Sequence, residues 1–202
     1  MTAHGVVLLR AGKELRRNEV DAIRPLLDSL GVPTLGSIRA PGTVDGGDCV
    51  WLDAQTLAVG EGFRSNTNGI DQLASLLPDT TVLSVPLPQE GGPEACFHLG
   101  SIVSLLDGHL ALVHGSLAPP MLLDALKTRG FECLSCPSEE FDNQACNVLC
   151  TAPSRVVLAQ GNPRTTALLQ DHGVEVTSIV GEELMTLGTG GPTCLVLAVE
   201  RS

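Results

Sequence analysis

Three residues far apart in the sequence, Asp45, His98 and Cys194, are of the types that covalent catalysis requires. A cysteine thiolate can attack a carbon centre, an imidazole can carry protons, and a carboxylate can orient the imidazole. Each residue also has an ordinary structural interpretation. Asp45 stands in an Asp-Gly turn pair, a lone histidine often fills a core or caps a helix, and most cysteines are buried and inert. Their positions in a repeat favour the catalytic interpretation.

Two basic positions in an acidic chain could bind a carboxylate. Arg16, followed by Arg17, stands at the start of the first predicted helix, and Arg64 lies in the loop EGFRSNTNG before the second. An exposed, solvated arginine is the ordinary alternative at both positions. A guanidinium can also bind a carboxylate through two parallel hydrogen bonds, better than lysine can. That interpretation would make the ligand an amino acid.

The elements that must position these residues form a repeat. Glycine and proline divide the chain into units of two short strands, a helix and a third strand, over about 41–90, 91–140 and 141–185. The units begin at 45, 98 and 147, with spacings of 53 and 49 residues, which is typical of repeat architectures. Loops at matching positions of a repeat fold collect on one face, so Asp45, His98 and Cys194 could converge.

The two ends of the chain contain less than a full unit. Residues 1–40 predict a strand, a helix and a strand but no strand before them, and residues 190–200 predict one closing strand that contains Cys194. The organisation predicted from this pattern is a single α/β domain over 1–202, incomplete at its N-terminal end. Unpaired strand edges at both ends would favour a homodimer.

Four further cysteines allow a competing interpretation as a zinc site. Cys133 and Cys136 form a CxxC pair, and Cys146 and Cys150 follow. The segment FECLSCP predicts a strand, however, and an odd separation on a strand directs the first two sulfurs to opposite faces. This argues against zinc and against a thioredoxin-like redox pair, although a zinc-stabilised module stays open as a hypothesis.

Composition excludes several classes of protein. The 202 residues include 12 Lys+Arg and 23 Asp+Glu, for a formal charge of -11, and only 2% are aromatic, which argues against nucleic-acid binding. With 43% hydrophobic residues and a mean hydropathy of +0.22 the chain is not of the disordered class.

No apolar run approaches the roughly 18 residues of a membrane span. An apolar start followed by basic residues reverses the order of a signal peptide, and seven scattered cysteines indicate reduced thiols. Both features predict a cytoplasmic protein with no membrane partner.

Several segments together carry a family resemblance: TVDGGDCVWLDAQTLAVGEGFRSNTNGIDQL, HLGSIVSLL, ACNVL and GGPTCLVL. The chain resembles the guanidino-group modifying superfamily, which includes amidinotransferases and arginine deiminases. It looks most like the dimethylarginine dimethylaminohydrolase branch, because arginine deiminases usually have an acid at the position of Gly100. The resemblance implies a pentein fold, a five-bladed α/β propeller of ββαβ units.

The same resemblance implies roles for the candidate residues. Cys194 is expected to be the nucleophile, His98 the general acid/base and Asp45 its partner. Arg16 and Arg64 are expected to hold the α-carboxylate of a small guanidino amino acid. The implied enzyme is a hydrolase that cleaves the guanidino C–N bond of a free arginine or methylated arginine through a covalent cysteine intermediate, without a cofactor or metal. Its products are citrulline and an amine.

One departure from the family supports an alternative function. The family's guanidinium-binding acids lie mainly in a segment before the position that matches Gly5, and Asp48 is the nearby acid of this chain, which we interpret as a buried turn carboxylate. Five units of this length need roughly 250 residues, so about one unit is missing and Met1 is expected to be internal to a longer ancestor. The alternative is a catalytically silent truncated fragment or pseudoenzyme that pairs with another chain. The substrate stays open among arginine, methylarginines and shorter guanidino compounds.

Overall fold

The computed structural model describes residues 1–2, 4–90, 92 and 97–197. These residues form two compact units, Met1–His98 and Leu99–Leu197. The organisation as a single domain stays a prediction.

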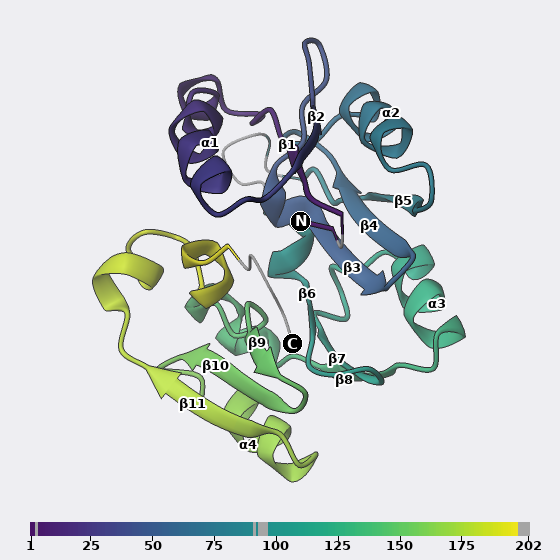
Figure 1. Cartoon of the computed structure of the whole chain (residues 1–202). Coiled ribbons are helices and arrows are strands. Elements are labelled where there is room, and N and C mark those ends of the chain that lie inside the picture. The colour runs from purple at the N-terminus through teal and green to yellow at the C-terminus, as the bar shows by residue number, and fades with distance from the viewer. Residues whose placement is uncertain (3, 91, 93–96, 198–202) are drawn as a thin grey trace. The chain divides into compact units, whose positions relative to one another are not determined.

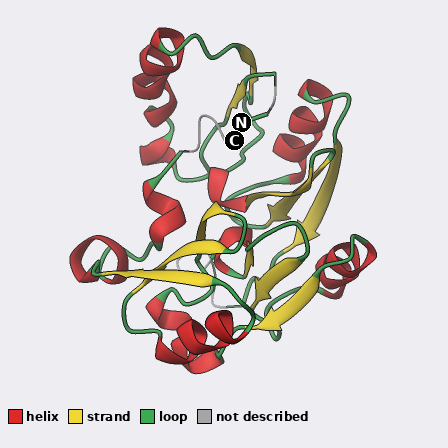
Figure 2. Ribbon diagram, turned by 60° about the horizontal axis from the view of Figure 1, so that its bottom comes forward, coloured by secondary structure: helices red, strands yellow, loops and turns green. Residues whose placement is uncertain are grey.

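Short strands alternate with helices throughout both units, as Figure 2 shows by colour. The strands are β1 (Val6–Leu8), β2 (Thr34–Ser37), β3 (Cys49–Asp53), β4 (Thr56–Glu61), β5 (Thr81–Pro86), β6 (Val103–Leu105), β7 (Leu110–Val113), β8 (Glu132–Ser135), β9 (Leu149–Ala152), β10 (Arg155–Ala159) and β11 (Glu175–Ile179). The α-helices are α1 (Glu19–Ser29), α2 (Thr67–Leu76), α3 (Pro120–Thr128) and α4 (Pro163–Asp171). None of the helices in the described part of the chain is long and apolar enough to cross a membrane.

Three ββαβ units share one pairing pattern. In each three-stranded sheet the middle strand pairs antiparallel with the strand before it and parallel with the strand after it, in the orders β3-β4-β5, β6-β7-β8 and β9-β10-β11. A parallel pair needs a crossover connection, which the helix of each unit supplies. Figure 1 shows α2 beside β5, α3 beside β8 and α4 beside β11. The predicted repeat is therefore confirmed.

In the described residues, the predicted partial first unit corresponds to one small strand-helix-strand element. It consists of β1, α1 and β2, and its two strands pair in parallel as a two-stranded sheet. The buried side chains of Val6, Leu8 and Leu27 form its core.

Local signals explain why the helices begin and end where they do. Pro120 occupies the first turn of α3, where the missing N–H costs nothing, and Gly130 and Gly173 follow α3 and α4 with φ of 82° and 78°. Leu122 and Leu126 of α3 are fully buried. Burial of each contributes about 1.5–3 kcal/mol to folding, so the predicted apolar face is a packing face.

The predicted closing strand over 190–200 is wrong over its first part. Residues Pro192–Leu195 form a 3₁₀ turn, in which the Cys194 N–H donates to the Gly191 carbonyl at 3.0 Å. Proline has no N–H for a ladder bond, and its fixed φ suits the first turn of a helix. Residues 198–200 of this prediction lie outside the described residues.

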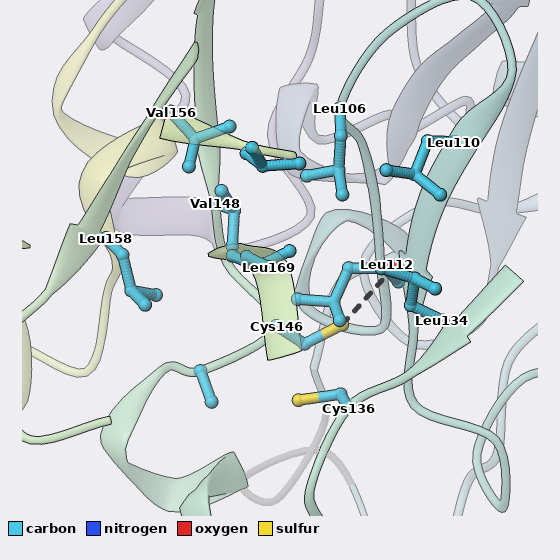
Figure 3. Close-up of a cluster of buried hydrophobic side chains, with 12 residues drawn as sticks. Leu106, Leu110, Leu112, Leu134, Cys136, Cys146, Val148, Val156, Leu158 and Leu169 are labelled. Carbon is cyan, nitrogen blue, oxygen red and sulfur yellow. Dashed lines mark hydrogen bonds between the residues drawn. The ribbon is translucent and has the colours of Figure 1, made fainter. Parts of the chain in front are cut away.

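The zinc hypothesis is wrong, because the four sulfurs do not share a centre. Cys133 is exposed, whereas Cys136 and Cys146 are 2% and 0% exposed and lie side by side in the apolar core of the second unit (Figure 3). The Cys150 thiol donates to the carbonyls of Leu106 and Ala152, each at 3.1 Å. Among the described residues no group of three or more His, Cys, Asp or Glu could hold a metal ion.

Candidate active site

The Asp-Gly-Gly-Asp segment forms a tight turn directly before β3. Asp45 is extended, residues Gly46–Asp48 form a 3₁₀ turn, and the two acidic residues are 5% and 1% exposed. A 3₁₀ helix has three residues per turn, so acids three positions apart lie on the same side. A Cβ on Gly47 would lie 2.8 Å from His98 Cγ. The absence of a side chain at Gly47 therefore lets the imidazole pack against the turn.

Asp48 forms the closest polar contact of His98. The His98 Nδ1 lies 3.0 Å from Asp48 Oδ1, and Ser65 Oγ donates to Asp48 Oδ2 at 2.5 Å. An ionised carboxylate only accepts, so Nδ1 carries the hydrogen and Nε2 is left for proton transfer. The sequence interpretation of Asp48 as a buried turn carboxylate missed this contact with the imidazole. The three-residue spacing from Asp45 was the available signal.

Asp45 lies on the other side of the His98 ring. Its Oδ2 is 3.8 Å from His98 Nε2 and 2.5 Å from Arg64 Nη2, while its Oδ1 accepts a hydrogen bond from the Gly12 N–H at 2.8 Å. The Ser65 Oγ also accepts a hydrogen bond from the Asp45 N–H at 3.0 Å. The structure therefore brings Asp45 and His98 together, as their matching positions in the repeat predict, and it places Arg64 against Asp45.

The two candidate arginines lie in different environments. The Arg64 side chain is only 12% exposed, and its buried Nε has no hydrogen-bond partner among the described residues. The Arg16 side chain is 49% exposed on a surface turn and pairs with Glu19 at 2.8 Å. The hydrogen bond from Arg16 lowers the pKa of Glu19. Arg64 joins the buried acid–histidine cluster through its contact with Asp45, whereas the role of Arg16 stays a prediction.

Cys194 lies in the second unit and its residue is exposed. It stands in the 3₁₀ turn Pro192–Leu195, and its sulfur accepts a hydrogen bond from Asn147 Nδ2 at 3.6 Å. An accessible sulfur with a hydrogen-bond donor directed at it is suited to a nucleophile. Sequence reasoning did not single out Asn147.

Cys49, directly after the acidic turn, is the other cysteine near candidate site residues. Desolvation by burial, together with the negative charge of Asp48, raises the pKa of Cys49 to about 12. A thiol with this pKa is protonated at neutral pH and is a poor nucleophile.

Alkylation with iodoacetamide should therefore distinguish the cysteines of the folded protein. At pH 8 we expect carbamidomethylation of the exposed Cys194, slower carbamidomethylation of Cys133, whose pKa is raised by desolvation, and none of Cys49, because only the thiolate reacts. Peptide mass spectrometry after a short pulse measures each site. Unfolding in guanidinium chloride before the pulse is the control and should make Cys49 react as well. Rapid labelling of Cys49 in the native protein would contradict its assigned environment.

The repeated ββαβ units define a pentein-type fold, and the buried acids, histidine and arginine give it a site suited to acid–base chemistry. Solved structures agree with this class. A dimethylarginine dimethylaminohydrolase from Pseudomonas aeruginosa in complex with citrulline superposes with a TM-score of 0.79 at 25% identity, over 96% of this chain and 70% of that one. The N-terminal domain of ArgZ, an arginine dihydrolase from cyanobacteria, superposes with a TM-score of 0.85 at 21% identity, over 100% and 72%.

Sequence comparisons identify the family. The family model for arginine deiminase matches residues 1–124 and 119–201, so the chain belongs to the arginine deiminase family. An arginine deiminase of Mycobacterium bovis is 31% identical over 186 residues, which cover 75% of this chain and 45% of the enzyme. An uncharacterized protein of Aeropyrum pernix is 28% identical over 193 residues, which cover 96% of this chain and 66% of that protein. The chain thus spans two thirds or less of the length of these relatives.

Proposed function

We propose that this protein is a hydrolase that cleaves the guanidino C–N bond of a free arginine derivative, giving citrulline and an amine through a covalent intermediate on Cys194. The observation that carries the proposal is the placement of His98 between two buried carboxylates, with Asp48 at Nδ1 and Asp45 facing Nε2. The family is named for arginine deiminase, and a structural relative has been solved with citrulline. The family and the structural relative therefore both support an arginine derivative as the substrate.

The proposed reaction has two halves that use His98 in opposite directions. The Cys194 thiolate attacks the central guanidinium carbon, and the C–N bond to the departing nitrogen breaks as His98 delivers a proton to that nitrogen. His98 then takes a proton from water, whose oxygen attacks the same carbon of the S-alkylthiouronium intermediate. The C–S bond breaks and the thiolate is regenerated. One water is consumed for each citrulline and amine formed.

The acids around His98 adapt it to both halves. The Asp48 carboxylate holds the Nδ1–H, which orients the ring and leaves Nε2 as the atom that gives and takes the proton. The Asp45 carboxylate, beside Nε2, is placed where a cationic guanidinium would be attracted as well. Full protonation of the guanidinium makes its carbon more electrophilic.

Arg64 supports recognition of a free amino acid. Its guanidinium is held by Asp45 through Nη2, while the buried Nε meets no hydrogen-bond partner within the part of the chain that the structure describes. A buried donor without a partner is costly, and a substrate α-carboxylate would satisfy it. We assign Arg64 to that carboxylate, with Arg16 as a second ligand. Gly100 favours a methylated arginine as the substrate. The proposed location of the enzyme is the cytoplasm.

A product assay tests the proposal. The purified protein is incubated separately with L-arginine, monomethylarginine and asymmetric dimethylarginine, and citrulline and the released amine are quantified by mass spectrometry. We expect citrulline with a matching amount of ammonia, methylamine or dimethylamine. An acid-quenched reaction should show the amidino adduct on the peptide that contains Cys194. Absence of citrulline from all three substrates in a cooperatively melting sample would overturn the proposal.

The small sheet of the first strand-helix-strand element favours one other function. Its sheet contains only β1 and β2 in the described residues, and a two-stranded sheet leaves strand edges that another chain could pair with. A catalytically silent protein that binds another chain would give no citrulline at any substrate concentration. The product assay therefore separates the two functions.

A further inference from the structure

Asn147 connects the turn that carries Cys194 to the core of the second unit. The Asn147 Oδ1 accepts two hydrogen bonds from Thr193, one from the backbone N–H at 3.1 Å and one from Oγ1 at 2.6 Å. The Nδ2 of the same amide donates to Cys194 Sγ at 3.6 Å. One side chain therefore contacts the residue before the nucleophile and the nucleophile itself.

These contacts fix which way the amide faces. The backbone N–H and the hydroxyl of Thr193 both contact the same atom of the Asn147 side-chain amide. Because a backbone N–H can only donate, this amide atom must be the acceptor, which is the oxygen. The other atom is then the NH₂ group, and it points at the sulfur of Cys194. The donor directed at the sulfur is a consequence of the Thr193 contacts.

The backbone around Asn147 is itself held firmly. Asn147 is 3% exposed, and Ser104 Oγ on β6 donates to the Cys146 carbonyl at 2.7 Å and accepts from the Val148 N–H at 3.0 Å. The backbone N–H of Asn147 donates to the Gln144 carbonyl at 3.0 Å. The amide therefore meets Cys194 from a backbone position fixed on both sides.

Gly191 permits the close approach of the two segments. A Cβ at position 191 would lie 2.4 Å from both Cγ and Oδ1 of Asn147. Real Cβ atoms do not come this near to another heavy atom, so any side chain here would push the amide away. A glycine at 191 and an amide at 147 together shape the turn around the nucleophile.

We propose that Asn147 is a positioning residue for Cys194: its oxygen holds the turn through Thr193, and its NH₂ group orients the sulfur and stabilises it as a thiolate. This inference rests on the role of Cys194 in the proposed function. An N–H donor stabilises a thiolate more than a neutral thiol, because a hydrogen bond to a charged acceptor is stronger. A residue that only held the turn in place would need the amide oxygen of Asn147 but not its NH₂ group.

Asn147→Asp separates these two roles. The aspartate keeps the size of the side chain and an oxygen for both Thr193 donors, but it replaces the NH₂ donor with a second acceptor. Asn147→Ala removes the donor without adding charge. Asn143→Asp, at an exposed position four residues earlier, is the matched control for the same chemical change.

The measurement is the pH dependence of Cys194 alkylation by iodoacetamide, followed on its peptide. We expect Asn147→Asp to slow alkylation at pH 7 by about tenfold or more, with the pH midpoint moved upward and the rate at high pH retained. Asn147→Ala should move the midpoint in the same direction by less, and Asn143→Asp should stay within about twofold of the wild type. Unchanged midpoints in both Asn147 variants would overturn the proposal.

Alkylation requires no turnover, so the two proposals can fail separately. A midpoint shift in a protein that forms no citrulline would support Asn147 as a positioning residue and overturn the hydrolase function. Citrulline formation with unchanged midpoints would do the reverse.

Discussion

Replacing Cys194 with alanine is expected to reduce kcat for citrulline formation by at least about four orders of magnitude, the scale found when a covalent nucleophile is removed. No other group of the proposed mechanism can form the bond to the guanidinium carbon. The residue is exposed, so its replacement should leave the thermal unfolding midpoint unchanged. Steady-state kinetics with the preferred arginine derivative and a thermal melt of the same sample check both statements.

Cys133→Ala is the matched control for this variant. Cys133 is also exposed and lies on β8 of the same unit. Its kcat should remain within about twofold of the wild type, as for a surface substitution. Retention of a tenth or more of the activity by Cys194→Ala would place the nucleophile elsewhere. Cys49 would be a poor substitute, because burial raises its pKa to about 12.

The sequence was sufficient to predict the repeat because its signals are local. Turn glycines, Pro120 at a helix start and alternating apolar runs each act over a few residues, and the three units repeat them in the same order. The closing strand was mispredicted for the opposite reason. The apolar run after Cys194 resembles a strand, but Pro192 and the contacts of Asn147 with Thr193 hold its start in a 3₁₀ turn.

The candidate site was predictable only in part. The matching positions of Asp45 and His98 in the repeat indicated that they lie together, as they do. The orientation of the imidazole, however, depends on which carboxylate contacts its Nδ1, and that carboxylate is Asp48. The two arginines look alike in the sequence, since each precedes a helix. The two arginines differ in burial because of contacts between distant segments of the chain. The segment at Gly12 packs against Arg64, since a Cβ on Gly12 would lie 2.5 Å from the Arg64 backbone oxygen. Arg16 stays on the surface.

A comparison of Asp48→Asn with Asp45→Asn should separate the roles of the two carboxylates. Asp48→Asn keeps the size of the side chain but removes the carboxylate that accepts from His98 Nδ1, and its amide can present a donor to Nδ1 instead. The related loss of an orienting carboxylate in a serine protease costs about 10⁴ in kcat. We expect a fall in kcat of roughly 10² to 10⁴, with little change in KM. Steady-state kinetics of the variant and the wild type at one pH measure both constants.

Asp45→Asn is expected to act mainly on substrate binding. Asp45 holds Arg64 through Oδ2 and the Gly12 backbone through Oδ1, so its neutral amide would release the guanidinium that we assign to the substrate carboxylate. KM should rise by about tenfold to a hundredfold, the scale of one charged hydrogen bond, and kcat should fall less than in Asp48→Asn. Agmatine, which lacks the α-carboxylate, provides the control substrate. Its KM should rise less in Asp45→Asn than the KM of the arginine derivative, because agmatine loses only the attraction between Asp45 and the guanidinium. If Asp45→Asn instead gave the larger loss of kcat, Asp45 would be the carboxylate that orients the imidazole, and the hydrogen bond from His98 to Asp48 would be structural.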